Sequence, residues 1–343
     1  MPTSATLDDF RYQEYILQGV SRTFALTIPQ LPSALQQVIG NAYLLCRIID
    51  TVEDDNALDA GQTRHMAQMF SDVVSGKVSA AQFSEILSPL LSNQTIPAEH
   101  DLIQHTDAVI RITHGFNPIQ RQALERCVSI MGQGMIAYQE TASLAGLANL
   151  EEMNRYCYYV AGVVGEMLTE LFCDHSATIR QHKSVLMELA VSFGQGLQMT
   201  NILKDIWEDQ QRGACWLPQD IFLEHGFELK NLRPGCTDPG FQAGLLKLTG
   251  IARAHLSNAL TYTCLLPVNE TGIRRFCLWA IGMAVLTLNK LHANPDFTTG
   301  SQVKISRRSV RATIMLTNLL VSQNWALQRA FILAARKLPV GHL

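Results

Sequence analysis

Apolar residues recur with the period of an α-helix over most of this chain, and strand-like alternation bounded by turn residues is almost absent. The pattern predicts an all-α fold. Two predicted helix starts carry capping signals: Asn117 precedes Pro118, and Asn149 stands three residues before Glu152. The least regular stretch, residues 213–240, is rich in Pro and Gly. We interpret it as a loop that folds over a site, although a linker between two domains is the alternative.

The chain is poor in charge. Charged residues make up 17% of it, against about 25% in an average soluble domain. The formal net charge is −3, so no basic surface is available to hold nucleic acid. The eight cysteines lack CxxC or zinc-type spacing, which indicates free thiols in a reducing cytoplasm.

No signal peptide is visible at the N-terminus. The longest uncharged apolar run, residues 276–288, has 13 residues, whereas a transmembrane helix needs about 20. We therefore expect a cytoplasmic protein without a transmembrane helix.

An acidic stripe lies on a predicted helix, residues 41–55, that is apolar almost all round. The spacing is four, three and four residues, which puts the side chains on one helix face: Tyr43, Arg47, Asp50 and Asp54. We call this face the first acidic stripe. A second acidic stripe follows the same principle, with spacings of three, four and four: Gln198, Asn201, Asp205 and Asp209.

One such stripe could be an ordinary solvated face, but two on apolar helices are harder to explain that way. Ionised carboxylates in a low-dielectric site cost several kcal/mol each unless a cation compensates them. Oxygen ligands without nearby histidine suit Mg²⁺, which typically links one or two carboxylates to substrate phosphates. The residues therefore predict a helical cavity that binds a phosphorylated ligand through Mg²⁺. A di-iron bundle is the rival, but it requires Glu-x-x-His pairs that neither stripe has.

Four segments resemble the squalene/phytoene synthase family in order and spacing. They are SRTFALTI (21–28), YLLCRIIDTVEDD (43–55), YCYYVAGVVGEML (156–168) and LQMTNILKDIWEDQQRG (197–213). The DTVEDD form, RRFCLWAIGMAVLTL (274–288) and VKISRR (303–308) look more like squalene synthase than phytoene synthase. The resemblance implies the isoprenoid-synthase fold, a single domain over residues 1–343 in which helices surround a deep central cavity.

The resemblance also implies an activity. A squalene synthase joins two farnesyl diphosphates head to head (1′-1) into presqualene diphosphate, and NADPH-dependent rearrangement then gives squalene. The alternatives are a dehydrosqualene or phytoene synthase, which omits the reduction, and a non-catalytic helical assembly factor that kept the fold. Intact acidic motifs favour an enzyme.

The resemblance assigns roles to individual residues. Catalytic roles fall to Tyr156, Asp50, Asp54, Asp205 and Asp209. Diphosphate contacts fall to Arg22, Thr23, Phe24, Tyr43, Arg47, Gln198, Asn201, Lys204 and Arg212. The Mg²⁺ ligands are expected among Asp50, Glu53, Asp54, Asn201, Asp205 and Asp209, and the NADPH phosphates near Lys304 and Arg307.

The C-terminal segment from Thr313 to Leu338 is apolar and carries the bases Arg329, Arg336 and Lys337. Two interpretations remain open for it. It is either a closing helix of the bundle or a surface for peripheral membrane contact.

Overall fold

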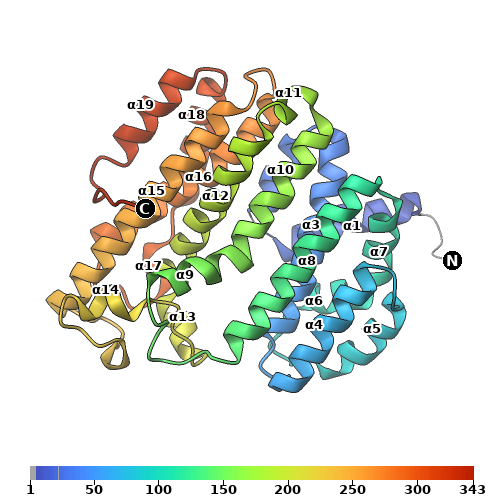
Figure 1. Ribbon diagram of the computed structural model, residues 1–343, viewed down its shortest axis with the longest axis horizontal. Coiled ribbons are helices and arrows are strands. Elements are labelled where there is room, and N and C mark those ends of the chain that lie inside the picture. The colour runs from blue at the N-terminus through green and yellow to red at the C-terminus, as the bar shows by residue number, and fades with distance from the viewer. Residues whose placement is uncertain (1–4, 22) are drawn as a thin grey trace. The chain divides into compact units, whose positions relative to one another are not determined.

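The protein is described from a computed structural model, for residues 5–21 and 23–343 (Figure 1). Within these residues all regular secondary structure is helical, and the one strand-like feature is an isolated parallel bridge between Leu147 and Pro218. The predicted all-α fold is confirmed. The chain divides into two compact units, the first formed by residues 1–140 and Met167–Lys183, the second by Thr141–Glu166 and Ser184–Leu343.

The first unit is built largely from N-terminal helices. They are α1 (Leu7–Val20), α2 (Phe24–Thr27), η1 (Ile28–Gln30), α3 (Ser33–Asp54), α4 (Ala60–Val74), α5 (Ala80–Leu87), η2 (Ser88–Leu90), α6 (Pro97–Gln104), α7 (Thr106–Gly115), α8 (Pro118–Gln139) and α11 (Ala177–Arg180). Helix α10 (Val163–His175) begins in the second unit and ends in the first, and α12 (Lys183–Lys204) begins at the boundary.

The second unit contains the remaining helices. They are α9 (Leu150–Cys157), η3 (Tyr158–Gly162), α13 (Ile206–Gln211), α14 (Gln219–Leu223), η4 (Leu229–Asn231), α15 (Pro239–Leu265), α16 (Thr271–Ala293), α17 (Gly300–Val303), α18 (Arg307–Leu320) and α19 (Asn324–Ala334).

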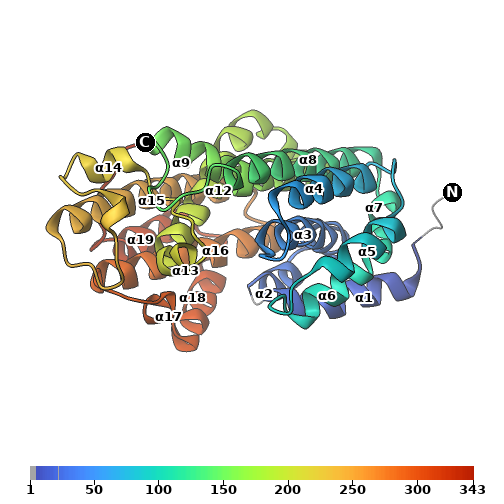
Figure 2. The ribbon, with the colours of Figure 1, turned by 90° about the horizontal axis from the view of Figure 1, so that it is seen from below.

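Helix α3 is the core helix of the first unit, as its apolar sequence predicted. Leu44, Leu45 and Ile48 are completely buried, and α3 packs against α1, α4, α7 and α8, which lie around it in Figure 2. The predicted caps are also present. The side chain of Asn117 accepts a hydrogen bond from the Gln120 N–H at 3.0 Å, and that of Asn149 accepts one from the Glu152 N–H at 2.9 Å.

Small residues bring two helical segments of the second unit into backbone contact. A Cβ on Gly165 would lie 2.3 Å from the carbonyl oxygen of Ala190, and a Cβ on Gly194 would lie 2.3 Å from that of Ala161. The segment before α10 adapts to this contact by forming a π-helical turn, Tyr158–Gly162. The YCYYVAGVVG block is therefore required for close helix packing, whatever else it lines.

The irregular stretch 213–240 is folded rather than extended. It includes α14 and η4, and its apolar side chains at Trp216, Leu217 and Phe222 are buried. The bridge from Pro218 to Leu147 attaches it to the segment before α9. Its role as a loop over the site stays a prediction.

Helix α16 is longer than the uncharged run from which the sequence argument was made. Among the described residues it is the one helix whose length and composition would allow it to cross a membrane: it has 23 residues and a mean hydropathy of 1.3 over its most apolar window. Of that window, 56% is buried inside the protein, as in a core helix. The helix exceeds the uncharged run of 13 residues because charged and polar ends extend it on both sides.

A buried histidine in the second unit makes stability depend on pH. His255 Nδ1 lies 2.8 Å from Ser192 Oγ, which also accepts a hydrogen bond from Asn258 Nδ2 at 3.0 Å. Burial lowers the pKa of His255 from 6.5 to about 4. Between pH 6.5 and pH 4 this histidine is protonated in the unfolded chain and neutral in the folded chain. The free energy of unfolding therefore falls as the pH falls.

We expect the free energy of unfolding to decrease by up to about 3 kcal/mol between pH 6.5 and pH 4 through this one group. Urea titrations over that range measure it, in the wild type and in His255→Asn. The variant, which has no ionisable group at this position, should show a smaller slope with pH. Equal slopes in the two proteins would contradict the assignment.

Candidate active site

The first acidic stripe lies on the last three turns of α3. Asp50 is half-buried, with 29% of its side chain exposed, and its Oδ2 lies 3.9 Å from Nη1 of Arg47. Arg47 makes its closer ion pair with Glu99, a buried residue of α6. The stripe therefore has one guanidinium, that of Arg47, for several carboxylates. Glu99, which the sequence analysis missed, already forms the closer ion pair with it.

The shortage of positive charge is reflected in a raised pKa of Asp50. Burial raises the pKa of Asp50 to about 7, Arg47 opposes the shift, and the negative charges of Asp54 and Glu99 add to it. A carboxylate that is this reluctant to ionise gains strongly from an added cation. That Asp50 holds Mg²⁺ stays a prediction.

The N-terminal part of the predicted site gathers around Tyr43. The ring of Phe24 lies against the ring of Tyr43 with centroids 4.9 Å apart, and the Tyr43 hydroxyl donates to the Val20 carbonyl at 3.0 Å. Ser21 Oγ accepts from the Phe24 N–H at 2.9 Å. Thr23 is exposed beside them. Arg22, a predicted diphosphate contact, lies outside the described residues.

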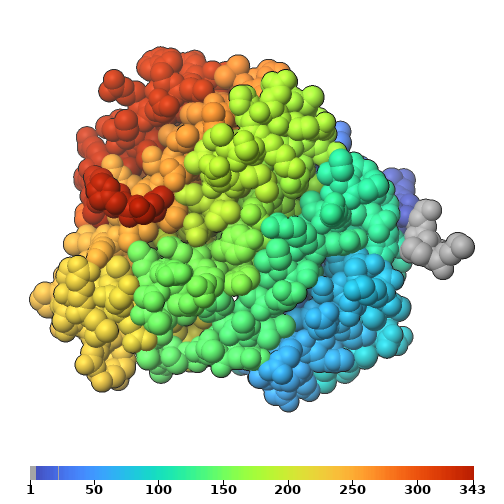
Figure 3. Space-filling view, in the orientation of Figure 1, coloured from blue at the N-terminus to red at the C-terminus, as the bar shows by residue number. Residues whose placement is uncertain are grey.

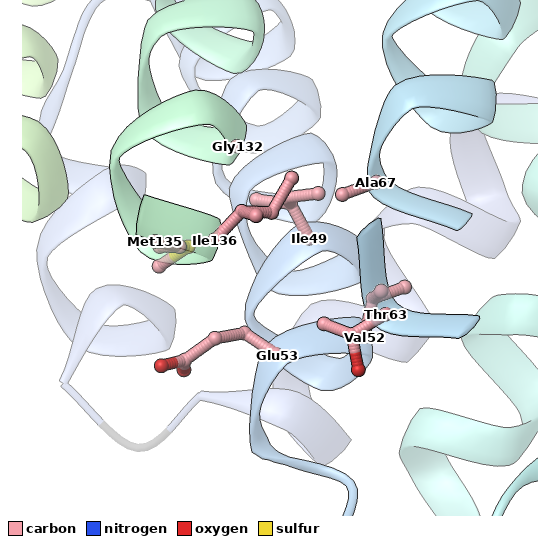
Figure 4. Close-up of a pocket in the computed structure, with 8 residues that line it drawn as sticks. All are labelled: Ile49, Val52, Glu53, Thr63, Ala67, Gly132, Met135 and Ile136. Carbon is pink, nitrogen blue, oxygen red and sulfur yellow. The ribbon is translucent and has the colours of Figure 1, made fainter. Parts of the chain in front are cut away.

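The other carboxylates of the DTVEDD motif have separate environments. Asp54 is the exposed last residue of α3. Glu53 lines a pocket on the side of α3 that faces α4 and α8, shown in Figure 4 together with Ile49, Val52, Thr63, Ala67, Gly132, Met135 and Ile136. Its predicted role as a metal ligand rests on the sequence alone.

Asp55 has a structural role. It is buried and accepts hydrogen bonds from the N–H of Ala57 at 2.8 Å and of Ser92 at 2.9 Å, and from the Thr95 hydroxyl. Although burial opposes the shift, these hydrogen bonds lower the pKa of Asp55. The side chain fixes the turn that ends α3.

The second acidic stripe does not follow one continuous helix. Helix α12 ends at Lys204, and α13 begins at Ile206. The turn keeps the i→i−4 hydrogen bonds, because Asp205 N–H donates to Asn201 O at 2.8 Å and Asp209 N–H donates to Asp205 O at 2.9 Å. The expectation of a single helix was wrong in this detail, since a short break at Asp205 was not visible in the apolar pattern.

Asp205 resembles Asp50 of the first acidic stripe, because burial raises the pKa of both carboxylates. Lys204 Nζ lies 2.9 Å from its Oδ2, and both side chains remain about one-third exposed. Burial raises the pKa of Asp205, while Lys204 opposes the shift and Glu208 adds to it. Gln198 is half-buried, Asn201 is exposed on α12, and Arg212 is exposed after α13.

Asp209 and Tyr156 are brought together through a residue that was not predicted. Asp209 lines a small pocket with Trp216, and the Tyr156 ring stacks on Trp216 with centroids 4.3 Å apart and planes 11° apart. Tyr156 itself is 7% exposed. The signal for Trp216 was the WLP sequence, which begins three residues after the LQMTNILKDIWEDQQRG segment and which the sequence analysis treated only as part of a loop.

The VKISRR segment starts beside the second stripe. The Gly300 N–H donates to Glu208 Oε1 at 2.9 Å, and a Cβ on Gly300 would lie 3.2 Å from Asp205 Oδ1. Three residues of α17 then lead to Lys304, which is exposed, as is Arg307. Neither cation forms an ion pair with another described residue. Glu208 and Gly300 were not predicted, because their contact joins positions 92 residues apart.

Each stripe offers carboxylate oxygens without a neighbouring histidine, and this is the donor chemistry that suits Mg²⁺. Asp50 and Asp54 belong to the first unit, Asp205 and Asp209 to the second. Within the described residues no cluster of three or more His, Cys, Asp or Glu side chains could hold a metal alone. A partial set of carboxylates is what Mg²⁺ uses when phosphate oxygens and water complete its octahedron. That the two stripes face each other stays a prediction.

The comparison that decides the family covers most of the chain. The family model described as Squalene/phytoene synthase matches residues 17–309. The chain belongs to the squalene/phytoene synthase family. The matched region includes both acidic stripes, Tyr156 and the VKISRR segment, so the family resemblance drawn from the motifs is confirmed.

Curated relatives of this squalene/phytoene synthase family member include yeast proteins. A squalene synthase of Candida albicans is 29% identical over 290 residues, which is 83% of this chain and 62% of the relative. One of Cyberlindnera jadinii is 29% identical over 305 residues, 88% of this chain and 65% of the relative. The chain thus spans less than two thirds of these relatives.

Solved structures share the fold. TcSQS in complex with a ligand aligns with a TM-score of 0.69 and 20% identity, over 96% of this chain and 98% of that one. A dehydrosqualene synthase aligns with a TM-score of 0.63 and 20% identity, over 90% and 94%. These similarities confirm the all-α isoprenoid-synthase fold.

Proposed function

We propose that the chain is a prenyltransferase of the squalene synthase type, which condenses two farnesyl diphosphates head to head into presqualene diphosphate. The observation that carries the proposal is the state of Asp50. It is a carboxylate on an apolar helix, its pKa is raised to about 7, and the nearest cation, Arg47, pairs more closely with Glu99. Such a site is completed by a cation and an anionic ligand that arrive together, as Mg²⁺ and a diphosphate do.

Each group of residues has a task in this reaction. Arg47, Lys204 and Arg212 would supply positive charge for diphosphate oxygens, and the carboxylates of Asp50, Asp54, Asp205 and Asp209 would hold Mg²⁺. When bound, Mg²⁺ stabilises the negative charge that develops as the allylic C–O bond breaks.

The stacked rings of Tyr156 and Trp216 offer a π-face to the carbocation that remains. The reaction joins the two C15 chains, releases one diphosphate and loses one proton. Asp209, beside Trp216, places negative charge near that ring pair.

A second step would convert presqualene diphosphate, NADPH and a proton into squalene, diphosphate and NADP⁺. The exposed Lys304 and Arg307 are the proposed contacts for NADPH phosphates. Their segment is anchored beside Asp205 through the Glu208–Gly300 hydrogen bond, which supports a cofactor position next to the reacting diphosphate. Between Lys304 and Arg307, Ser306 caps α18 by accepting a hydrogen bond from the Ser309 N–H at 3.1 Å.

We expect Lys304→Gln/Arg307→Gln to raise KM for NADPH by on the order of tenfold or more and to leave formation of presqualene diphosphate unchanged, because two charge-assisted contacts are lost in the second step only. Product analysis with and without NADPH measures both quantities. If wild-type protein releases dehydrosqualene whether or not NADPH is present, the chain is instead a dehydrosqualene synthase. If it releases no hydrocarbon and no diphosphate, the assembly-factor alternative stands.

The cellular site is also a proposal. All eight cysteines are free thiols, and six of them are buried. Buried, unpaired thiols are typical of a reducing compartment, which supports a cytoplasmic location.

A further inference from the structure

The last 47 residues of the chain, 297–343, have an unusual charge. They contain seven Lys and Arg residues and no Asp or Glu, so they carry +7 in a chain whose net charge is −3. The preceding 296 residues therefore carry −10. Positive charge is concentrated on the helices α18 and α19 and the segments beside them.

The same helices expose large apolar side chains. No residue of α18 is buried. The exposed side chains are Met315 (74%), Leu319 (74%), Trp325 (70%), Ile332 (57%) and Leu333 (63%), and we call them the C-terminal patch. The segment that carries them forms the red surface of its unit in Figure 3.

Apolar and cationic residues share helix faces. On α18 the exposed residues Arg308, Arg311, Met315 and Leu319 follow spacings of three, four and four. On α19 the exposed residues Trp325, Arg329 and Ile332 follow spacings of four and three, and the exposed Arg336 lies two residues beyond the end of this helix. Helices with Trp, Leu and Ile beside Arg and Lys lie in the interface of a bilayer, with the apolar side chains among the acyl chains and the cations at the phosphates.

The patch is displayed on a fixed scaffold rather than on a frayed end. The turn between α18 and α19 is held by the buried Arg274, whose Nε donates to Val321 O at 2.7 Å. Asn324 Nδ2 donates to Cys264 O at 3.0 Å, and Leu327 packs with Val321 in the core. Leu327 of α19 and Val321 after α18 are therefore committed to the core, while the residues of the C-terminal patch stay exposed.

We propose that the C-terminal patch docks the protein on the surface of a bilayer that contains anionic phospholipids. Charge complementarity selects this occupant, because seven cations without one acid match an anionic headgroup layer. A second copy of the chain would bring like charges together, since a two-fold contact pairs a surface with itself. The inference depends on the surface alone and not on the reaction proposed above.

Trp325 is a built-in reporter for this contact. The other tryptophans are 1%, 8% and 5% exposed, at Trp207, Trp216 and Trp279. We expect vesicles of phosphatidylcholine with phosphatidylglycerol to shift the fluorescence of the full-length protein to the blue, and brominated acyl chains to quench it. Trp325→Phe should lose both changes. Vesicles of phosphatidylcholine alone should bind on the order of a hundredfold more weakly at low salt.

Flotation with the same vesicles tests the contributions of the cationic and the apolar side chains separately. Arg329→Gln/Arg336→Gln/Lys337→Gln should reduce partitioning by on the order of a hundredfold, and Trp325→Ser/Leu333→Ser by more than tenfold. Ile119→Ser, which changes an exposed apolar side chain of α8, is the matched control and should bind as the wild type does. Binding that is equal in wild type and both variants would overturn the proposal. So would a dimer in sedimentation that Trp325→Ser/Leu333→Ser dissociates while vesicle binding is absent.

Discussion

Asp50→Asn should lower kcat for the condensation by on the order of a thousandfold, because it removes an ionised oxygen ligand from the proposed Mg²⁺–diphosphate site. The same variant should fold at least as stably as the wild type in the absence of Mg²⁺ at pH 8. Burial and the nearby charges of Asp54 and Glu99 raise the pKa of Asp50 to about 7. A raised pKa means that stability is lost as the pH rises through 7, and asparagine avoids that loss.

Asp55→Asn is the matched control from the same motif. Asp55 accepts from Ala57 and Ser92 and ends α3, so the variant should lose about 2 kcal/mol of stability and keep kcat within a few-fold. Steady-state kinetics measure kcat and urea unfolding measures stability, for each of the two variants. An Asp50→Asn enzyme with wild-type kcat would remove the first stripe from the mechanism.

Gly194→Ala should destabilise the second unit by about 3 kcal/mol or more, because the new Cβ would lie 2.3 Å from Ala161 O and 2.5 Å from Ala161 C. These are backbone atoms of the π-helical turn Tyr158–Gly162, which directly follows α9, so neither segment can yield without moving Tyr156 and its neighbours. Turnover should fall together with stability. Urea unfolding at 25 °C and initial rates on the same preparation measure both.

Gly132→Ala is the control for that substitution. It is also a helical glycine, but its Cβ would meet only the side chain of Ile49, at 3.4 Å, and it would project into the pocket of Figure 4. Alanine favours a helix by up to about 1 kcal/mol over glycine, so this variant should be as stable as the wild type or more stable. Equal losses in Gly132→Ala and Gly194→Ala would show that the cost is not specific to the contact between Gly194 and Ala161.

The parts of the site that follow from local spacing could be predicted from the sequence. The stripe of Arg47, Asp50 and Asp54 depends only on the period of one helix, and α3 has that period over its whole length. The Asn117 cap and the all-helical fold are local properties of the same kind. The family motifs added the roles, which spacing alone could not supply.

The parts that depend on distant contacts could not be predicted. Glu99 competes for Arg47 from 52 residues away, Trp216 stacks on Tyr156, and Gly300 meets Glu208 from a third segment. None of these pairs has a periodic relation in the sequence. The break at Asp205 was missed for a different reason, because the backbone hydrogen bonds, and with them the apolar pattern, continue through it.

The C-terminal helices show how the structure decided between two interpretations of one pattern. The amphipathic period of residues 313–338 was compatible with a closing helix of the bundle or with an exposed surface. The structure places Leu327 in the core and leaves Trp325 exposed, and membrane contact of the exposed face stays a prediction. Only the exposed fractions could separate them, since both faces contain leucine and isoleucine.

The most direct test of the proposed function is mass spectrometry of the products that purified protein makes from labelled farnesyl diphosphate and Mg²⁺ without NADPH. We predict a C30 cyclopropyl diphosphate, presqualene diphosphate, formed from two labelled C15 units with release of one diphosphate. Addition of EDTA should stop its formation. A protein that yields only C15 products, or a C30 product that forms equally well without a divalent cation, would contradict head-to-head condensation at a magnesium site.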